Sequence, residues 1–409
     1  MVEIDSRLSM ANLAKPEVRA DPYSLYQRLR SEDPVHWDEP MGFWVITRYA
    51  ELVRGLHEPR FSKAQGMTAA LGRYPDDEHA LARPIYHFFS KQLLYADPPY
   101  HSHLRGLMNK AFTPRVVERM RGGIQRLVDE LLDAAPASGS WDVISQFAYP
   151  LPARVILNML GLPPSERERF KEWSDDFGAT IGVVRRTPKA QMEKSGHSLA
   201  AFAAYIDHFQ ASHCQAGHDD LLTALFNAEE QSSRLSREEL VANAMLLLFA
   251  GHETTTNLIG NGLLALLRHP HQMQLLRDEP QRLPEAIEEM MRYDSPVQVV
   301  WRLATEDIEL GGKMIQKGQM VNFMLGAANR DPEQFPEPDR FDITRNAGKQ
   351  VDFGLGTHFC LGAPLARLEA PIAFESLLRR LPRMRLGAEV LEYKEQPVFH
   401  ALKALPVTV

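Results

Sequence analysis

The segment from Leu235 to Pro270, LSREELVANAMLLLFAGHETTTNLIGNGLLALLRHP, predicts one helix of unusual length. Ser236 stands at the N-cap with Glu239 at the capping-box position, and His269 before Pro270 predicts the end. About 33 residues at 1.5 Å each give roughly 50 Å, enough to cross a whole domain. The stretch from Ala242 to Ala250 is apolar almost all round, so we expect it to be buried. The rest of the chain then packs around this helix.

The middle of this segment, GHETTT at residues 251–256, departs from the pattern of a buried helix. Gly251 loses conformational entropy there, and threonines can hydrogen-bond back to helix carbonyls and bend the helix. Local violations of this kind are expected at functional sites. A packing kink around a satisfied Glu253 explains the motif equally well at this point.

Helical signals dominate the remaining sequence. In DPYSLYQRLRSED, Asp21 and Pro22 serve as cap and first-turn proline, and Leu25 and Leu29 share one face. Strand signals are confined to MGFWVITRY, IELGGKMIQKGQMVNF and the tail FHALKALPVTV. No repeat or Gly/Ser linker divides the 409 residues, so we expect one mainly α domain with a small β part. The helix-rich part is expected at 97–296 and 360–381, and the β-rich part at 35–60, 297–325 and 382–409.

Charge and composition exclude several classes of protein. The 46 Lys and Arg against 53 Asp and Glu give a net charge of −7, which offers no broad basic field to nucleic acid. The N-terminus lacks the basic and apolar regions of a signal peptide, and no apolar run approaches the roughly 18 residues of a membrane span. Two cysteines cannot build a disulfide framework. We expect a soluble, cytoplasmic monomer without a membrane anchor.

The decapeptide FGLGTHFCLG, residues 353–362, places Cys360 among glycines and one histidine. A zinc site needs four ligands, and only His358 stands nearby. A catalytic thiol would need a base from elsewhere, and a buried structural cysteine is the plain alternative. A metal thiolate remains, because Pro364 in a tolerated first-turn position predicts a helix start whose N–H groups face the sulfur. Glycines before it let the backbone turn tightly against a flat cofactor.

The decapeptide resembles the haem-binding loop F-G-x-G-x-H-x-C-x-G of the cytochrome P450 monooxygenases at every defined position. The resemblance implies a single-domain cytochrome P450 fold with haem b as cofactor and Cys360 as its axial thiolate ligand, the arrangement that favours O–O cleavage. It implies that His358 points toward a haem propionate. Phe353, Gly354 and Gly362 complete the expected loop.

Three further motifs follow the family's order. Glu289 and Arg292 match E-x-x-R, three residues apart on one helical face, and the family places them with Arg340 of FPEPDRF in a buried structural network. A surface ion pair is the alternative. His101 and Arg105 match H-x-x-x-R against the haem propionates, although paired basic residues on one helix face are more often solvated. Tyr100 and His103 differ from the family's usual acid and arginine. Arg302 matches a third propionate partner.

The GHETTT segment also resembles the family, as A-G-x-E-T-T from Ala250. The resemblance implies that Ala250 and Gly251 let the long helix lie against the distal haem face. Thr254 then hydrogen-bonds dioxygen and orders water, while Glu253 relays protons as the catalytic acid. A peroxide-driven variant is disfavoured, because relatives of that type usually lack this acid-alcohol pair.

The resemblance implies an oxidoreductase that hydroxylates or epoxidises a hydrophobic small molecule, such as a fatty acid, terpenoid, steroid, polyketide or macrolide. The expected pocket is apolar, formed by Phe88, Phe89, Leu93, Leu94, Leu246, Val297, Val299, Val300, Val398 and Phe399 together with Ala250 and Thr254. Each is an ordinary core residue under the plainer interpretation. A haem-thiolate ligand-binding or sensor protein without turnover is the main alternative, and a Cys-dependent hydrolase has only Cys360 in its favour.

The resemblance also implies electron transfer from a ferredoxin and its reductase, with NAD(P)H as the ultimate source. Lys110, Arg115 and Arg367 could form a basic dock for an acidic ferredoxin, which predicts coupling that weakens with salt. His208, His213, Cys214 and His218 gather in sequence, but we expect a fortuitous surface cluster rather than a metal site.

Overall fold

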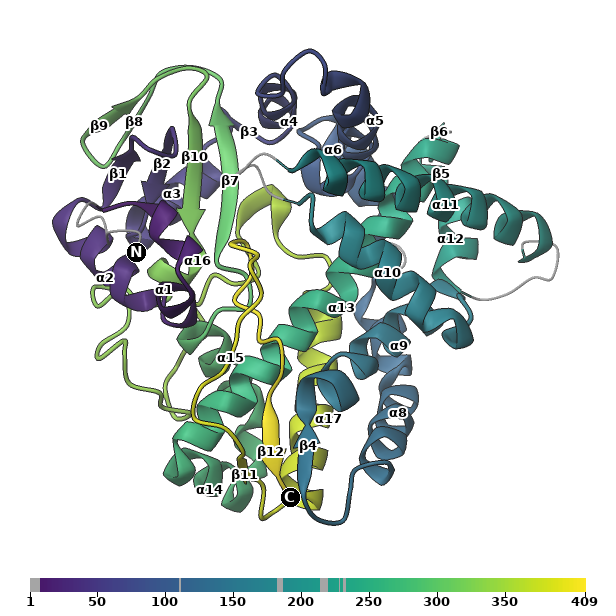
Figure 1. Cartoon of the computed structure of the whole chain (residues 1–409), viewed down its shortest axis with the longest axis vertical. Coiled ribbons are helices and arrows are strands. Elements are labelled where there is room, and N and C mark those ends of the chain that lie inside the picture. The colour runs from purple at the N-terminus through teal and green to yellow at the C-terminus, as the bar shows by residue number, and fades with distance from the viewer. Residues whose placement is uncertain (1–7, 110–111, 182–186, 214–219, 228, 231–232) are drawn as a thin grey trace. The chain divides into compact units, whose positions relative to one another are not determined.

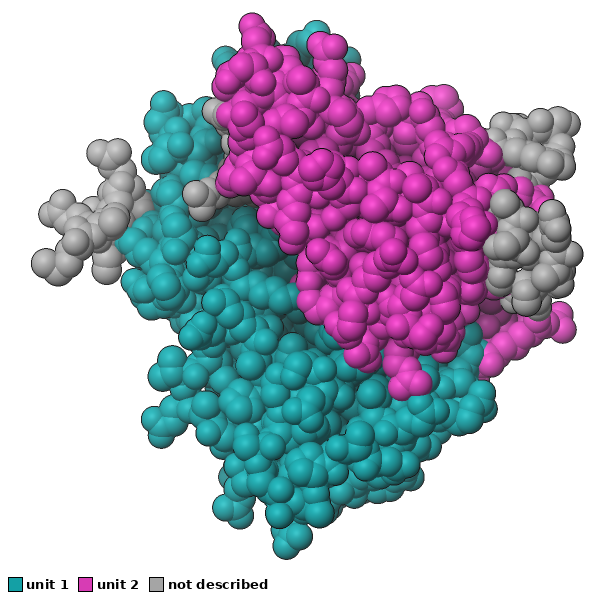
Figure 2. Space-filling view, turned by 45° about the vertical axis from the view of Figure 1, so that its right-hand side comes forward, with its two compact units in different colours: residues 1–61, 120–151, 254–409 teal, residues 62–119, 152–253 magenta. Residues whose placement is uncertain are grey.

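The computed structural model describes residues 8–109, 112–181, 187–213, 220–227, 229–230 and 233–409. It is mainly helical with short strands, which confirms the fold class expected from the sequence (Figure 1). Internal contacts group the chain into two compact units. Unit 1 comprises residues 1–61, 120–151 and 254–409, and unit 2 comprises residues 62–119 and 152–253 (Figure 2, teal and magenta). Within the described residues, no helix combines the length and apolarity that crossing a membrane requires.

Unit 1 contains all but a few of the strands. Its helices and helical turns are η1 (Met10–Ala14), α1 (Pro16–Ala20), α2 (Tyr23–Glu32), α3 (Tyr49–His57), α8 (Arg121–Asp133), η3 (Ile144–Ala148), α14 (Pro270–Asp278), η6 (Pro280–Arg282), α15 (Leu283–Tyr293), α16 (Leu325–Ala328), η7 (Gly356–His358) and α17 (Ala363–Arg380). Its strands are β1 (Val35–Asp38), β2 (Phe43–Ile46), β4 (Ser140–Asp142), β7 (Val299–Ala304), β8 (Ile308–Leu310), β9 (Lys313–Ile315), β10 (Met320–Met324), β11 (Arg385–Leu386) and β12 (Pro406–Thr408).

The main sheet has the order β1-β2-β10-β7-β3, where β3 (Phe61–Ser62) lies at the edge. β10 pairs parallel with β2 and antiparallel with β7, in a register that sets Val321 opposite Arg302. Strands β2 and β10 are buried along their whole length, which explains why their sequences, FWVI and MVNFM, are apolar except for Asn322. The sheet therefore forms one wall of the unit 1 core, and Leu355 from the loop before Cys360 packs against that core.

Unit 2 is almost entirely helical. It contains α4 (Ala64–Leu71), α5 (His79–Ser90), η2 (Leu93–Tyr95), α6 (Tyr100–Asn109), α7 (Pro114–Arg119), η4 (Pro164–Glu166), α10 (Arg167–Gly178), α11 (Lys189–His213), α12 (Leu221–Asn227), and the short strands β5 (Glu229–Glu230) and β6 (Ser233–Arg234). An aromatic cluster holds these helices together, because Phe177 of α10 packs edge-on against Phe89 at 5.5 Å and Phe249 at 5.4 Å between ring centroids. Helices α9 (Pro150–Leu160) and α13 (Arg237–Arg268) contribute residues to both units.

Helix α13 is the long helix predicted from the sequence. Ser236 N–H donates to Glu239 Oε2 at 2.7 Å, and Glu239 N–H donates to Ser236 Oγ at 3.3 Å, so the capping box is formed in both directions. The helix ends at Arg268, before His269 and Pro270. Glu239 also accepts a 2.6 Å hydrogen bond from the hydroxyl of Tyr100 in α6.

Candidate active site

The loop that carries Cys360 lies between η7 and α17 in unit 1. The Cys360 N–H donates to the Phe353 carbonyl oxygen at 2.8 Å and closes the loop. Gly354 and Gly356 adopt left-handed backbone angles, with φ of 66° and 67°. A Cβ on Gly356 would also lie 3.1 Å from the Leu56 carbonyl oxygen of α3. Glycine at 356 is therefore required by both the turn and the close packing of the loop on α3.

Cys360 is half-buried and stands two residues before the N-cap of α17. A side chain at Gly362 would begin 3.9 Å from the Cys360 Sγ, so the glycine keeps the space beside the sulfur open. The first turn of α17 directs unpaired N–H groups and the positive end of the helix dipole to this region, which stabilises an anionic sulfur. In the part of the chain that the structure describes, no three His, Cys, Asp or Glu side chains cluster around a common metal position.

Arg367 of α17 holds the loop in place. Its guanidinium lies over the Phe353 ring at 4.5 Å from the centroid. It also forms a two-pronged ion pair with Glu288 of α15, at 2.7 and 3.1 Å. Burial raises the pKa of the neighbouring Asp352 carboxyl well above its usual range.

Glu289 and Arg292 form a fully buried ion pair on α15. Both side chains are 0% exposed, and Arg292 Nε and Nη2 donate to the two Glu289 oxygens at 2.6 and 2.9 Å. Arg292 also donates to the carbonyl oxygens of Asn329, Pro338 and Arg340 at 2.9, 2.8 and 3.3 Å. This geometry excludes the surface-pair interpretation of the E-x-x-R motif.

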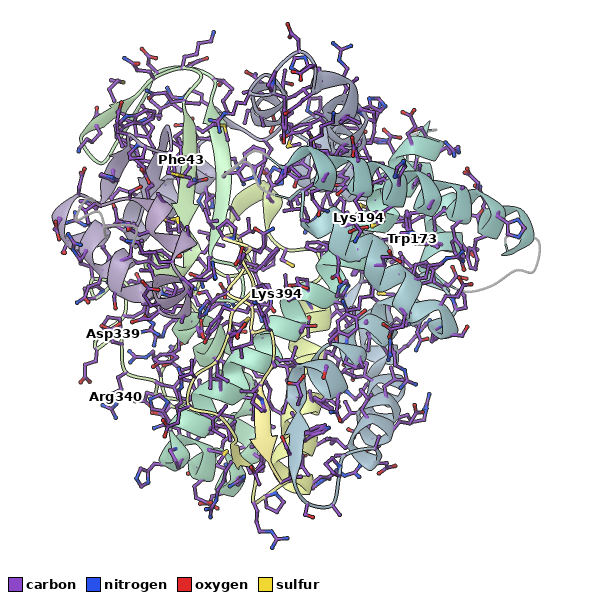
Figure 3. The ribbon with its side chains drawn as sticks, in the orientation of Figure 1. Phe43, Trp173, Lys194, Asp339, Arg340 and Lys394 are labelled. Atoms are coloured by element: carbon purple, nitrogen blue, oxygen red, sulfur yellow. The ribbon has the colours of Figure 1, made fainter. Side chains whose placement is uncertain are left out.

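The third side chain of this network is Arg345, which the sequence analysis did not identify. Arg345 Nε lies 3.3 Å from Glu289 Oε1, and the side chain is 12% exposed. The side chain of Arg340 is instead 58% exposed and lies on a loop at the outside of unit 1, next to Asp339 (Figure 3). Arg340 joins the network only through its carbonyl oxygen, which accepts from Arg292 and Arg345. The expected role of its guanidinium is corrected accordingly.

Asn329 connects the ion pair to the loop that carries Cys360. Its carbonyl oxygen accepts from Arg292, and its side-chain oxygen accepts the Val351 N–H at 2.8 Å. Its side-chain nitrogen donates to Ser295 Oγ at 2.9 Å. Val351 stands two residues before Phe353, so a continuous path of hydrogen bonds and short chain leads from the buried charges to Cys360.

The GHETTT segment interrupts the burial of α13. From Leu240 to Leu266, a stretch that is described without gaps, every residue is buried except Ala250, Gly251 and Thr254. Ala250 is exposed and Thr254 is half-buried, four residues apart and therefore on one face. A Cβ on Gly251 would lie 2.7 Å from the Ile156 side chain of α9. Glycine is required there by helix packing in unit 2, a reason that the sequence did not reveal.

Glu253, which precedes Thr254, is 7% exposed. His252 is also buried, and its Nδ1 lies 2.7 Å from the Leu248 carbonyl oxygen. The motif thus combines the buried carboxyl of Glu253 with the half-buried hydroxyl of Thr254, which lies on the face of α13 that also exposes Ala250. This combination can hold and transfer protons next to a bound ligand.

The residues predicted to bind the haem propionates belong to both units. In unit 2, His101 of α6 is 3% exposed, and Arg105 is half-buried with its Nε 3.1 Å from Asn109 Oδ1. In unit 1, Arg302 of β7 is 5% exposed and donates to the Trp301 carbonyl oxygen at 2.9 Å, and His358 is half-buried in η7.

Some of the expected pocket residues are brought together within each unit. In unit 1, Val297 and Phe399 form an isolated β-bridge, and the Gln298 N–H donates to the Val398 carbonyl oxygen at 2.8 Å. Val299 and Val300 follow directly in β7, and Val300 packs against the same core as Leu355. In unit 2, Phe89 and Leu93 are buried, Phe88 and Leu94 are half-buried, and Leu246 of α13 is buried.

Polar groups hold residues 91–93 to α13 and Asp97 to the start of α4 within unit 2. Asn243 accepts the Leu93 N–H at 2.8 Å and donates to the Lys91 carbonyl oxygen at 2.9 Å. Gln92 Nε2 donates to the Ala242 carbonyl oxygen at 3.0 Å. The carboxyl of Asp97 accepts from the Lys63 N–H at 2.9 Å. These bonds fix residues 91–93 to α13 and Asp97 to the residue before α4.

Several predicted surface residues carry less information. Lys110, Cys214 and His218 lie outside the described residues. Arg115 is exposed. The charge of Arg367 is neutralised by Glu288, so its contribution to a basic dock is smaller than the sequence suggested.

Comparison with known proteins identifies the class of this fold and site. The family model described as Cytochrome P450 matches residues 63–383. The chain is 40% identical to cytochrome P450 CYP107DY1 of Priestia megaterium over 98% of this chain and 99% of that protein. It is 39% identical to the vitamin D(3) 25-hydroxylase of Pseudonocardia autotrophica over 95% and 94%. The crystal structure of the myxobacterial cytochrome P450 CYP267B1 with myristic acid superposes with a TM-score of 0.87, at 38% identity over 98% and 99% of the two chains.

The chain belongs to the cytochrome P450 family. It is an oxidoreductase of the monooxygenase type that uses haem with a cysteine thiolate ligand and dioxygen. Its residues fit this cofactor, because Cys360 stands at a helix start and the least buried residues in the middle of α13 are the small residues Ala250, Gly251 and Thr254. The buried or half-buried side chains of Arg302 and His358 in unit 1, and of His101 and Arg105 in unit 2, carry N–H donors suited to carboxylates such as the haem propionates.

Proposed function

We propose that the protein hydroxylates or epoxidises an apolar small molecule of fatty-acid, steroid, terpenoid or polyketide type. The observation that carries the proposal is the loop of Cys360, closed by its hydrogen bond to Phe353 and braced by the buried pair of Glu289 and Arg292. The overall reaction consumes substrate, O2, two electrons and two protons, and it yields oxidised product and water. Bound haem supplies the redox chemistry.

The residues of the chain hold the cofactor and deliver protons. Cys360 ligates the metal, and Phe353, Gly354 and Gly362 shape the loop around it. His101, Arg105, Arg302 and His358 bind the propionates. We assign the relay of protons to the buried carboxyl of Glu253 and to the half-buried hydroxyl of Thr254 on α13.

The apolar pocket residues support the substrate class. Val297, Val300, Val398 and Phe399 in unit 1, and Phe88, Leu94 and Leu246 in unit 2, offer aliphatic and aromatic surface without charge. The vitamin D(3) hydroxylase and the structure with myristic acid are relatives whose names give substrates or ligands of this kind. Electrons are supplied by a ferredoxin, its reductase and NAD(P)H. The protein acts as a monomer.

Two measurements test the proposal. Myristic acid, vitamin D3, testosterone and a macrolide are first screened for a substrate-induced spin-state change in the absorption spectrum. Compounds that bind are then incubated with ferredoxin, reductase and NADPH, and products are sought by mass spectrometry. Oxidised product is expected from at least one compound. Binding without any product would favour the ligand-binding or sensor protein.

The reduced, CO-bound spectrum tests the ligand assignment. The wild-type protein is expected to show the long-wavelength Soret band of a thiolate complex, and Cys360→His is expected to lose that band while retaining haem. An unchanged band in Cys360→His would contradict the assignment of Cys360.

A further inference from the structure

The C-terminal tail of unit 1 carries two expected pocket residues on a short hairpin. Tyr393 bridges to Leu402, and the Lys394 N–H donates to the Ala401 carbonyl oxygen at 2.8 Å. Figure 3 labels Lys394 on this segment. At the tip, Val398 and Phe399 lie against the start of β7 through the bridge of Phe399 to Val297. A displacement of the tip would change the apolar surface that a substrate meets.

His400, the residue after Phe399, is anchored at both ring nitrogens. Nδ1 lies 2.6 Å from Asp294 Oδ1, and Nε2 lies 3.1 Å from the Arg19 carbonyl oxygen. Both partners are acceptors, so only the doubly protonated imidazolium donates to both. The ring is 4% exposed and stacks on Tyr393 at 4.2 Å between centroids, with an angle of 9° between the planes.

The backbone of His400 is held as well. Its N–H donates to the Pro296 carbonyl oxygen at 3.1 Å, and its carbonyl oxygen accepts from Asn261 Nδ2 of α13 at 2.8 Å. Asn261 is 1% exposed. The side chain and the backbone of one residue therefore fix the tip of the tail to α1, α13 and the segment that follows α15.

Several charged and titratable groups surround the ring. Asp294 is the nearest, and it also accepts the Tyr23 hydroxyl at 3.0 Å. Burial raises the pKa of Tyr23 and of Tyr393, so both phenols remain neutral. The other charged groups have partners of their own, since Arg330 lies over the Tyr23 ring and pairs with Asp339, and Arg19 pairs with Glu395. Asp21 raises the pKa of Tyr393 and Arg268 lowers it, so these two charges oppose each other.

We propose that His400 is a positioning residue that fixes Val398 and Phe399 for substrate binding and selectivity. Both ring contacts are complete only in the doubly protonated form. When the ring carries only one proton, one nitrogen is an acceptor that faces an oxygen, and that contact is lost. The tip then loosens, and the apolar surface at the start of β7 changes. The inference rests on the proposed function, in which these residues line the substrate pocket.

The test compares wild-type protein with His400→Gln and His400→Arg, and with His271→Gln as a control at an exposed histidine. Amide hydrogen exchange of residues 397–402 is measured on the haem-loaded protein at pH 6.5 and pH 9, corrected for the intrinsic effect of pH on exchange. Vitamin D3 binding is measured by the spin-state change at both pH values, because this ligand carries no titratable charge in that range.

Wild-type protein is expected to lose protection of the tip and to bind vitamin D3 about tenfold more weakly at pH 9, with the control variant unchanged from wild type. His400→Gln should show the weak binding at both pH values. His400→Arg keeps a cation with several donors, so it should protect the tip at both. Since all four proteins are haem-loaded and differ at one position, a general effect of pH on the haem would appear in each of them.

Three outcomes would overturn the inference. One is an exchange rate of the tip that is the same at both pH values in wild type, and another is tight vitamin D3 binding by His400→Gln at both. Loss of protection without any change in vitamin D3 affinity would reduce His400 to a structural residue. If vitamin D3 does not bind the wild type, the exchange data alone decide whether His400 holds the tip. The substrate class in the proposed function fails only if none of the four screened compounds binds.

Discussion

Replacement of Arg292 by leucine is the strongest test of how the loop of Cys360 is held. The substitution places an apolar side chain in a fully buried position and removes the charge partner of Glu289. It also leaves the carbonyl oxygens of Asn329, Pro338 and Arg340 without this donor. The carboxyl of Glu289 retains only the Asp342 N–H at 2.9 Å and Arg345 at 3.3 Å.

Breaking a buried ion pair from one side costs about 3–5 kcal/mol, because the remaining charge stays desolvated. The unfolding entropy of globular proteins near 60 °C is about 2.1 cal/mol/K per residue, which for 409 residues gives about 0.9 kcal/mol/K. The melting temperature should therefore fall by about 3–6 °C. Because Asn329 links Arg292 to Val351, we also expect the loop of Cys360 to loosen and haem content to fall.

Thermal unfolding by calorimetry and haem content per protein check both effects. Arg340→Ala is the matched control, because that side chain is 58% exposed and contributes only its carbonyl oxygen to the network. It should change stability by less than about 0.5 kcal/mol. Equal melting temperatures for Arg292→Leu, Arg340→Ala and wild type, with full haem content, would refute the reasoning, as would full haem content in Glu289→Ala.

Three further predictions follow from other buried or partly buried groups. Thr254→Ala should uncouple electron consumption from product and release peroxide, measured as NADPH, product and H2O2, while Thr256→Ala stays coupled. Asn243→Ala removes the buried acceptor of the Leu93 N–H, so urea unfolding should show a loss of about 1–3 kcal/mol and the Leu93 amide should exchange faster. Burial raises the pKa of Glu369 from 4.5 to about 8, so the folded protein keeps a proton that the unfolded chain releases, and stability falls as the pH rises through that window. Between pH 5.5 and 8.5, urea unfolding should show wild type losing about 3 kcal/mol relative to Glu369→Gln; parallel curves would contradict this.

Features set by local chemistry could be predicted from the sequence. The start of α13 follows from Ser236 and Glu239, whose reciprocal hydrogen bonds involve residues three apart. The spacing of Glu289 and Arg292 placed both on one face of a helix, and the glycines at 354 and 356 indicated a tight turn. In each case the partners lie within a few residues, so spacing alone carries the geometry.

Features that depend on distant segments could not be predicted in this way. Arg345 approaches Glu289 across 56 residues, and nothing in its local sequence separates it from Arg340, which points outward. The packing of Gly251 on Ile156 depends on how α9 approaches α13. His400 contacts the Arg19 carbonyl oxygen across 381 residues, so the residues around it in the tail sequence did not indicate this contact.

The network around Arg292 suggests why a buried charge pair is retained in a core where apolar residues could be equally stable. An apolar pair would remove the charges without cost, but it could not donate to the three carbonyl oxygens that Arg292 binds. Those carbonyls belong to irregular backbone between α16 and the loop of Cys360, where no helix or strand partner is present to satisfy them. The guanidinium of Arg292 therefore supplies the hydrogen-bond donors that a neighbouring strand would supply in a sheet. Glu289 neutralises the positive charge of that guanidinium. The ion pair is best understood as the means of holding a non-regular segment rigid, with Cys360 positioned by that rigidity before any cofactor is bound.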